Sequence, residues 1–229
     1  MFLKSLGLAL TVGLAAITLS ACGPQARSTV STMDGDSFLG PADAKVTVIE
    51  YGAPTCPGCK MWHDQNWEQL KSTFIDSGKV KFVFREFPSH NPPVDAAIFA
   101  MARCAGQADY FPLISEAFVR QVDIEKASQQ GEAQTALNSL GAKFRLSADQ
   151  VKSCISDKKN IDRIFAVREM ATANGVSSTP TFFINDRLVE DSSFSSMKGQ
   201  IEVLLSGEAP PPAAAPAPAE APATPAEQN

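Results

Sequence analysis

Two cysteines, Cys56 and Cys59, stand in the stretch YGAPTCPGCKMWH. The residues before it, KVTVIEYGA, alternate and then become apolar, which predicts a strand over Val46–Tyr51. Pro57 then begins a helix, because the first helical position needs no backbone N–H. A cysteine pair between a strand and a helix leaves three uses open: thiol–disulfide exchange, metal binding, or a structural cross-link.

The start of a helix is a favourable place for thiol chemistry. Free N–H groups and the helix dipole stabilise a thiolate there and lower its pKa. Cys56 lies at this point, and Cys59 lies one turn further on, on the predicted inner face with Trp67 and Leu70. We therefore expect Cys56 to attack or be attacked, and the less exposed Cys59 to resolve the mixed disulfide.

The two other uses of the pair are weaker. His63 completes a Cys-x-x-Cys-x-x-x-His pattern and His90 offers another nitrogen, but zinc sites usually contain a second close pair of ligands. A structural disulfide across so short a loop gains little. We expect no metal and no cofactor, and we interpret His63 as a packed or hydrogen-bonded side chain.

Later segments complete an α/β pattern. A second strand is predicted over Lys79–Phe87, and a hairpin over Thr181–Val189 with Asn185-Asp186 at its turn. Residues 92–174 indicate helices, and Phe194–Leu205 a last helix. This order predicts a four-stranded mixed sheet flanked by helices, with a helical insertion between its two halves.

The amino terminus predicts export. After Lys4, the apolar run Leu6–Leu19 is too short to cross a bilayer comfortably, which is typical of a signal peptide. The run ends in Leu-Ser-Ala-Cys, which resembles the cleavage box of bacterial lipoproteins. This resemblance implies a signal peptide over 1–21, a lipid on Cys22 and a linker over 22–37. The alternatives are an ordinary signal peptide and an uncleaved anchor.

Composition separates the carboxyl end from the rest of the chain. Residues 207–229 are almost entirely Ala, Pro and Glu, so we expect an extended tail that buries no core. The folded domain is then expected over 38–206. The chain carries 20 basic and 25 acidic residues without a basic cluster, which argues against a nucleic-acid partner.

Two motifs together carry a family resemblance. FLGPADAKVTVIEYGAPTCPGCKMWH, with GVSSTPTFFIND far downstream, resembles the DsbA-like thiol–disulfide oxidoreductases of the thioredoxin superfamily over about residues 38–205. Cys-Pro-x-Cys after a first strand and Thr-Pro before a penultimate strand are specific in combination. The family fold is a thioredoxin core with an inserted helical domain, in agreement with the predicted order of elements.

The resemblance implies roles for individual residues. Cys56 is the expected nucleophile and Cys59 the resolving cysteine, with Pro57-Gly58 supporting them. Thr179 is expected to offer backbone hydrogen bonds to an extended substrate. Pro180 is expected to be the cis-proline that faces the pair, and its alternative is an ordinary trans proline.

Glu50 lies six residues before Cys56 and matches a buried acid beneath the disulfide in the family. Such a carboxylate is desolvated and accepts a proton from the inner thiol, whereas the alternative is an exposed strand glutamate. Gly58 is a departure, because the best-known DsbA has a thiolate-stabilising histidine there. Thr179 also occurs in isomerase-like relatives, so the direction of electron flow stays open.

Two further cysteines, Cys104 and Cys154, lie near the apolar stripes of predicted helices; Ser147 marks the start of the second helix. Relatives often carry a cysteine in both places, so the resemblance implies a structural disulfide. It would close a loop of about 50 residues. Two buried free thiols are the alternative, although unpaired cysteines are hazardous in an oxidising compartment.

The leading functional hypothesis is a monomeric enzyme, tethered to the periplasmic face of a bacterial membrane, that introduces disulfides into exported proteins. The resemblance implies reoxidation by a DsbB-like, quinone-linked membrane partner. A disulfide isomerase or reductase of the same fold is the first alternative. A non-enzymatic chaperone, or a metallochaperone presenting Cys56 and Cys59, is the second.

Overall fold

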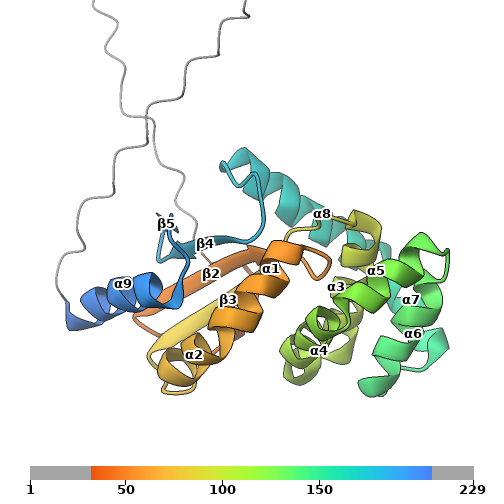
Figure 1. Ribbon diagram of the computed structural model, residues 1–229, viewed down its shortest axis with the longest axis horizontal. Coiled ribbons are helices and arrows are strands. Elements are labelled where there is room, and N and C mark those ends of the chain that lie inside the picture. Colours follow the sequence, from red (N-terminus) through yellow and green to blue (C-terminus); the bar gives the residue numbers. More distant parts are fainter. Residues whose placement is uncertain (1–31, 208–229) are drawn as a thin grey trace, which may run out of the picture.

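A mixed sheet is the centre of the fold (Figure 1). The computed structural model describes residues 32–207, so the predicted signal peptide, the lipidation of Cys22 and nearly all of the tail lie outside the described residues. The sheet has the order β1-β3-β2-β4-β5. The strands are β1 Ser37–Leu39, β2 Val46–Gly52, β3 Val80–Glu86, β4 Thr181–Ile184 and β5 Arg187–Val189.

The central strands β2 and β3 run parallel, and their residues are almost all buried because helices cover the sheet. The other neighbouring strands pair antiparallel. In this register Glu50 lies opposite Phe84 on one side and Phe182 on the other. A carboxylate therefore lies in the middle of the sheet, among aromatic side chains.

The sheet has one strand more than the predicted four, and this strand begins one residue before the expected start of the domain at residue 38. Strand β1 begins at Ser37, which is buried, and pairs with β3. Just before it, Asp36 forms an ion pair of 2.5 Å with Arg85. A strand of three residues is too short to show alternating apolar and polar side chains in the sequence. In the structure it is held by pairing with β3 and by the ion pair between Asp36 and Arg85.

The helical segment after Cys56 is continuous but irregular. It comprises α1 Pro57–Trp62, a π-helical stretch His63–Trp67, α2 Glu68–Leu70 and a second π-helical stretch Lys71–Ile75. Of the predicted inner face, Cys59 and Leu70 are buried and Trp67 is half-buried. Phe74 is also buried, and His63 is half-buried. Short π-helical stretches are rare in proteins as a whole. Those that do interrupt an α-helix are often found at functional sites.

The insertion between β3 and β4 is entirely helical and lies to one side of the sheet (Figure 1). Its central helix α3 is buried along most of its length and contacts α4, α7 and α8. No helix in residues 32–207 combines the length and the hydropathy that crossing a bilayer requires. The helices are α3 Pro92–Ala105, α4 Gln107–Val119, α5 Gln121–Gln129, α6 Ala133–Lys143, α7 Ala148–Ile155 and α8 Lys158–Ala173, and α9 Phe194–Ser206 follows the hairpin.

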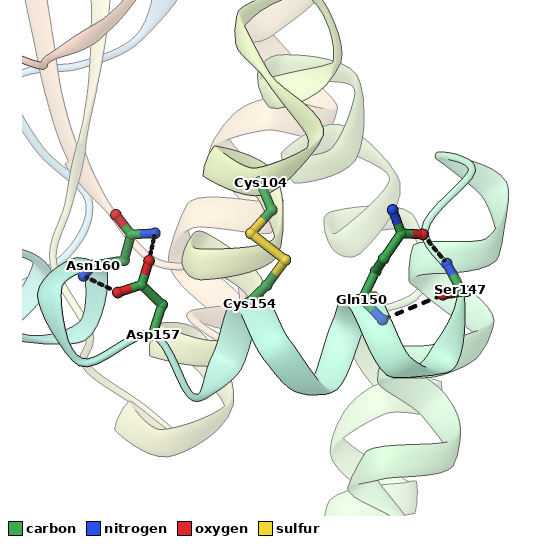
Figure 2. The surroundings of a disulfide bond; sticks show 6 residues. All are labelled: Cys104, Ser147, Gln150, Cys154, Asp157 and Asn160. Carbon is green, nitrogen blue, oxygen red and sulfur yellow. Dashed lines mark hydrogen bonds between the residues drawn. A yellow bond between two sulfur atoms is a disulfide. The ribbon is translucent and has the colours of Figure 1, made fainter.

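Figure 2 shows how α7 is attached to α3. Ser147 and Gln150 form a reciprocal capping box, as the sequence predicts for a helix start. One turn further on, a disulfide joins Cys154 of α7 to Cys104 near the end of α3. The alternative of two free thiols does not describe this structure.

Candidate active site

Cys56 is the N-cap residue of α1. Its backbone is extended, and its Sγ accepts a hydrogen bond of 3.2 Å from the backbone N–H of Cys59. Hydrogen bonding to Cys59 lowers the pKa of Cys56 to about 6, although burial acts in the opposite direction. The geometry that the sequence predicts for a reactive thiol is therefore present at this position.

Cys59 has the opposite environment. It is fully buried, whereas Cys56 retains 5% exposure, so the predicted order of accessibility is the observed one. Burial raises the pKa of Cys59 well above its ordinary value, and the hydrogen bond with Cys56 and the charge of Glu50 act in the same direction. One thiol of the pair thus ionises readily and the other stays protonated, and no disulfide joins them in this structure.

The Thr179–Pro180 loop closes the other side of the site. The peptide bond between these two residues is cis, which excludes the trans alternative. The Sγ of Cys56 lies 3.3 Å from the carbonyl oxygen of Thr179. A Cβ added to Gly58 would lie 3.3 Å from Pro180 Cδ, so the loop also faces the residue between the cysteines. Folding thus brings two motifs 123 residues apart into contact.

Glu50 lies beneath the pair and is fully buried, so the alternative of an exposed strand glutamate is wrong. Its Oε2 lies 2.9 Å from Nε2 of His63, and its Oε1 lies 3.2 Å away from the same nitrogen. The His63 ring packs on Phe118, with 4.5 Å between ring centroids, and lies 5.2 Å from Trp67. His63 is therefore packed and hydrogen-bonded, as predicted, but its partner was not foreseen.

The sequence reasoning missed two polar residues of the insertion that hold the segment around Cys56. Gln121 is buried, and its Nε2 donates hydrogen bonds of 2.7 Å to the carbonyl of Pro54 and 3.0 Å to that of Cys56. Asp95 accepts a hydrogen bond of 2.8 Å from the backbone N–H of Thr55. Asp95 had one visible signal, since it is the only charged residue in the apolar run PPVDAAIFAMA.

A family model described as thioredoxin matches residues 32–203, which is most of the chain. This chain belongs to the thioredoxin family. Among curated proteins it resembles the "Putative protein-disulfide oxidoreductase" of Rickettsia bellii, with 32% identity over 170 residues. That match covers 74% of this chain and 64% of the relative, so this thioredoxin-family chain spans a little under two thirds of that protein's length.

Two further similarities are to a disulfide-formation protein and to a DsbA structure. Disulfide bond formation protein D of Bacillus subtilis is 25% identical over 190 residues, which cover 81% of this chain and 84% of that protein. The crystal structure of alpha-DsbA1 from Wolbachia pipientis has a TM-score of 0.67 and 25% identity, covering 77% and 94% of the two chains. The predicted DsbA-like thioredoxin fold with a helical insertion is confirmed.

The lowered pKa of Cys56 in this thioredoxin-family chain leads to a pH prediction. Only the thiolate is alkylated, so we expect the rate at which iodoacetamide modifies Cys56 in the reduced protein to be half-maximal near pH 6 and to fall at lower pH. Quantifying the labelled peptide by mass spectrometry at a series of pH values measures this profile. Cys59 is the internal control, because its buried thiol should remain unlabelled. Half-maximal labelling near the ordinary thiol pKa of 9.0 would contradict the prediction.

Proposed function

We propose that this protein is a thiol–disulfide oxidoreductase that introduces disulfides into exported proteins. The observation that carries the proposal is the position of Cys56: its sulfur caps α1 and lies 3.3 Å from the carbonyl that precedes the cis-proline. The names of the disulfide-related relatives and the DsbA-like fold agree with this chemistry. Neither a holdase nor a metallochaperone requires two thiols of such different acidity.

In the oxidised protein Cys56 and Cys59 form a disulfide. A substrate thiolate attacks the Cys56 sulfur, which forms a mixed disulfide and releases Cys59 as a thiolate. A second substrate thiolate then attacks the substrate sulfur of that mixed disulfide and releases Cys56. Two substrate thiols become one disulfide, the Cys56–Cys59 pair gains the two electrons, and the low pKa of Cys56 makes it a good leaving group.

The released Cys59 thiolate must take up a proton, because burial strongly favours its neutral form. Glu50 is a buried acid whose charge acts on Cys59. Its carboxylate is also hydrogen-bonded to His63. We assign the proton transfer to Glu50. A carboxylate paired with an imidazole passes a proton on without holding an unpaired charge in the core.

The acidity of Cys56 also bears on the direction of electron flow. At pH 7, lowering the pKa from 9.0 to about 6 stabilises the reduced form by up to about 1.4 kcal/mol, or about 30 mV, before solvent screening reduces it. A more stable reduced form makes the pair a better oxidant. Gly58 has no side chain that could donate a hydrogen bond to the Cys56 thiolate, so it adds nothing to the oxidising character of the pair. For this reason an isomerase or reductase is the second candidate.

The cellular setting is part of the same proposal. The predicted lipoprotein signal and Cys22 support tethering to the periplasmic face of a bacterial membrane. There the protein would act as a monomer on exported proteins that contain cysteines. A membrane partner that passes electrons to quinone, like DsbB, would return the Cys56–Cys59 pair to its disulfide form.

The reduction potential of the Cys56–Cys59 pair tests this function. We would equilibrate the full chain, in detergent, with glutathione redox buffers and quantify the free Cys56 thiol. Known potentials run from about −120 mV for a strong oxidant to about −270 mV for a reductant. We expect a value above about −160 mV, whereas a value below about −220 mV would favour the isomerase or reductase. Absence of a reversible equilibrium would overturn the redox function itself.

A further inference from the structure

Asp95 is a fully buried carboxylate in α3, the central helix of the insertion. Both of its oxygens accept hydrogen bonds from the backbone of the thioredoxin core. Oδ1 accepts from the N–H of Thr55 at 2.8 Å, and Oδ2 accepts from the N–H of Ser89 at 3.0 Å. Burying a carboxylate costs free energy unless its oxygens are hydrogen-bonded. These two contacts offset that cost for Asp95.

The two backbone groups bound by Asp95 belong to opposite sides of the active site. Thr55 directly precedes the nucleophile Cys56. Ser89 continues to the cis-proline loop, because its Oγ lies 3.0 Å from Oγ1 of Thr179. One carboxylate therefore connects the segment that carries the attacking sulfur with the loop whose carbonyl lies 3.3 Å from that sulfur.

We propose that Asp95 is a positioning residue, which sets the placement of Cys56 relative to the Thr179–Pro180 loop. This inference rests on the proposed thiol–disulfide exchange at Cys56. The carboxylate of Asp95 binds the backbone N–H groups of Thr55 and Ser89, and it acts on the reacting sulfur atoms through these two residues. The helical insertion thus contributes to the redox site as well as covering the sheet.

The chemistry of the contact requires a carboxylate. The two N–H groups bind different oxygens of the same side chain, and a carboxylate offers an acceptor at both of these places, whereas an amide offers one. Burial raises the pKa of Asp95, and the hydrogen bonds from Ser89 and Thr55 oppose that shift by favouring the ionised form. Asp95→Asn has nearly the same shape but one acceptor oxygen, so one of the two N–H groups would face an NH₂ group.

The variant also separates positioning from simple electrostatics. Removing a buried negative charge would by itself favour the Cys56 thiolate and lower the pKa of Cys56. Loss of positioning has the opposite sign, because Cys56 would leave the place where the Cys59 N–H stabilises its thiolate. A rise in the Cys56 pKa in Asp95→Asn would therefore identify the positioning effect.

The test compares three variants by the pH profile of Cys56 alkylation and by denaturant unfolding. We expect Asp95→Asn to raise the Cys56 pKa by at least about 0.5, which makes alkylation at pH 6 about twofold slower relative to its plateau. Ser89→Ala, which changes no charge and removes only the contact to Thr179, should shift the profile in the same direction by less. Met101→Ala, at a buried site of the same helix facing Gly141, should lower stability and leave the profile unchanged.

The outcomes distinguish the inference from the function on which it rests. If the unsubstituted protein is half-maximally alkylated near pH 6 while both Asp95→Asn and Ser89→Ala keep that profile, Asp95 is structural only and the inference is wrong. If Asp95→Asn fails to fold, the Ser89→Ala profile decides. If the unsubstituted protein has the profile of an ordinary thiol, the proposed function fails, and the inference fails with it.

Discussion

Cys56→Ser is expected to reduce disulfide transfer to the uncatalysed rate, because a hydroxyl cannot form the mixed disulfide on which exchange depends. Cys59→Ala should behave differently. It retains Cys56 but cannot form the Cys56–Cys59 disulfide. Its Cys56 thiolate can still attack a disulfide of a test protein, and because Cys59 is absent and cannot attack the resulting mixed disulfide, this covalent complex should accumulate. Oxidation of a reduced, unfolded test protein, followed by its free thiols, measures the first effect, and non-reducing electrophoresis of Cys59→Ala mixed with a disulfide-containing test protein measures the second.

The chain supplies a matched control for this experiment. The double variant Cys104→Ala/Cys154→Ala removes the two cysteines of the insertion, which are bonded to each other. We expect it to keep disulfide transfer at temperatures where it remains folded. Full activity of Cys56→Ser would contradict the redox function and would favour a holdase-like chaperone, which does not need this thiol.

The same double variant carries the largest expected effect on stability. The disulfide between Cys104 and Cys154 closes a sequence separation of 50 residues. Constraining the unfolded chain over such a loop is worth about 4 kcal/mol in the chain-entropy model, so we expect the free energy of unfolding to fall by about that amount. Urea denaturation of the oxidised protein and of the variant measures the difference.

Reduction provides an independent check on the stability prediction. Excess dithiothreitol should bring the unsubstituted protein close to the variant, because both then lack the bond between α3 and α7. Cys56→Ser/Cys59→Ser is the control, since a bond across so short a loop constrains the unfolded chain much less. Equal stability of the double alanine variant and the unsubstituted protein would show that helix packing alone holds α7 in place.

Sequence patterns correctly predicted the elements that depend on residues close to one another in the chain. The hairpin strands β4 and β5 have the predicted limits, because the turn between them needs a left-handed residue and Asn185 adopts φ 46° there. The start of α7 follows from the capping box of Ser147 and Gln150. These features involve residues only a few positions apart, so their physical cause is contained in the sequence window that predicts them.

Other features had no local cause and were missed. Strand β1 is three residues long and exists because β3 offers an edge for pairing. The π-helical stretches after α1 leave no mark in the residue spacing. Asp95 stands out in an apolar run, but nothing in that run indicates that its carboxylate binds the backbone of Thr55 and Ser89.

The sequence by itself determined the chemistry of the site: a strand, a cysteine at a helix start, and a second cysteine one turn inside, which together set one acidic and one buried thiol. Only the tertiary structure decided what surrounds them. The contact of Cys56 with Thr179, the pairing of Glu50 with His63, and the carboxylate of Asp95 join segments between 13 and 123 residues apart. Such contacts arise when packing of the sheet and the insertion brings distant segments together, and no local periodicity encodes that arrangement.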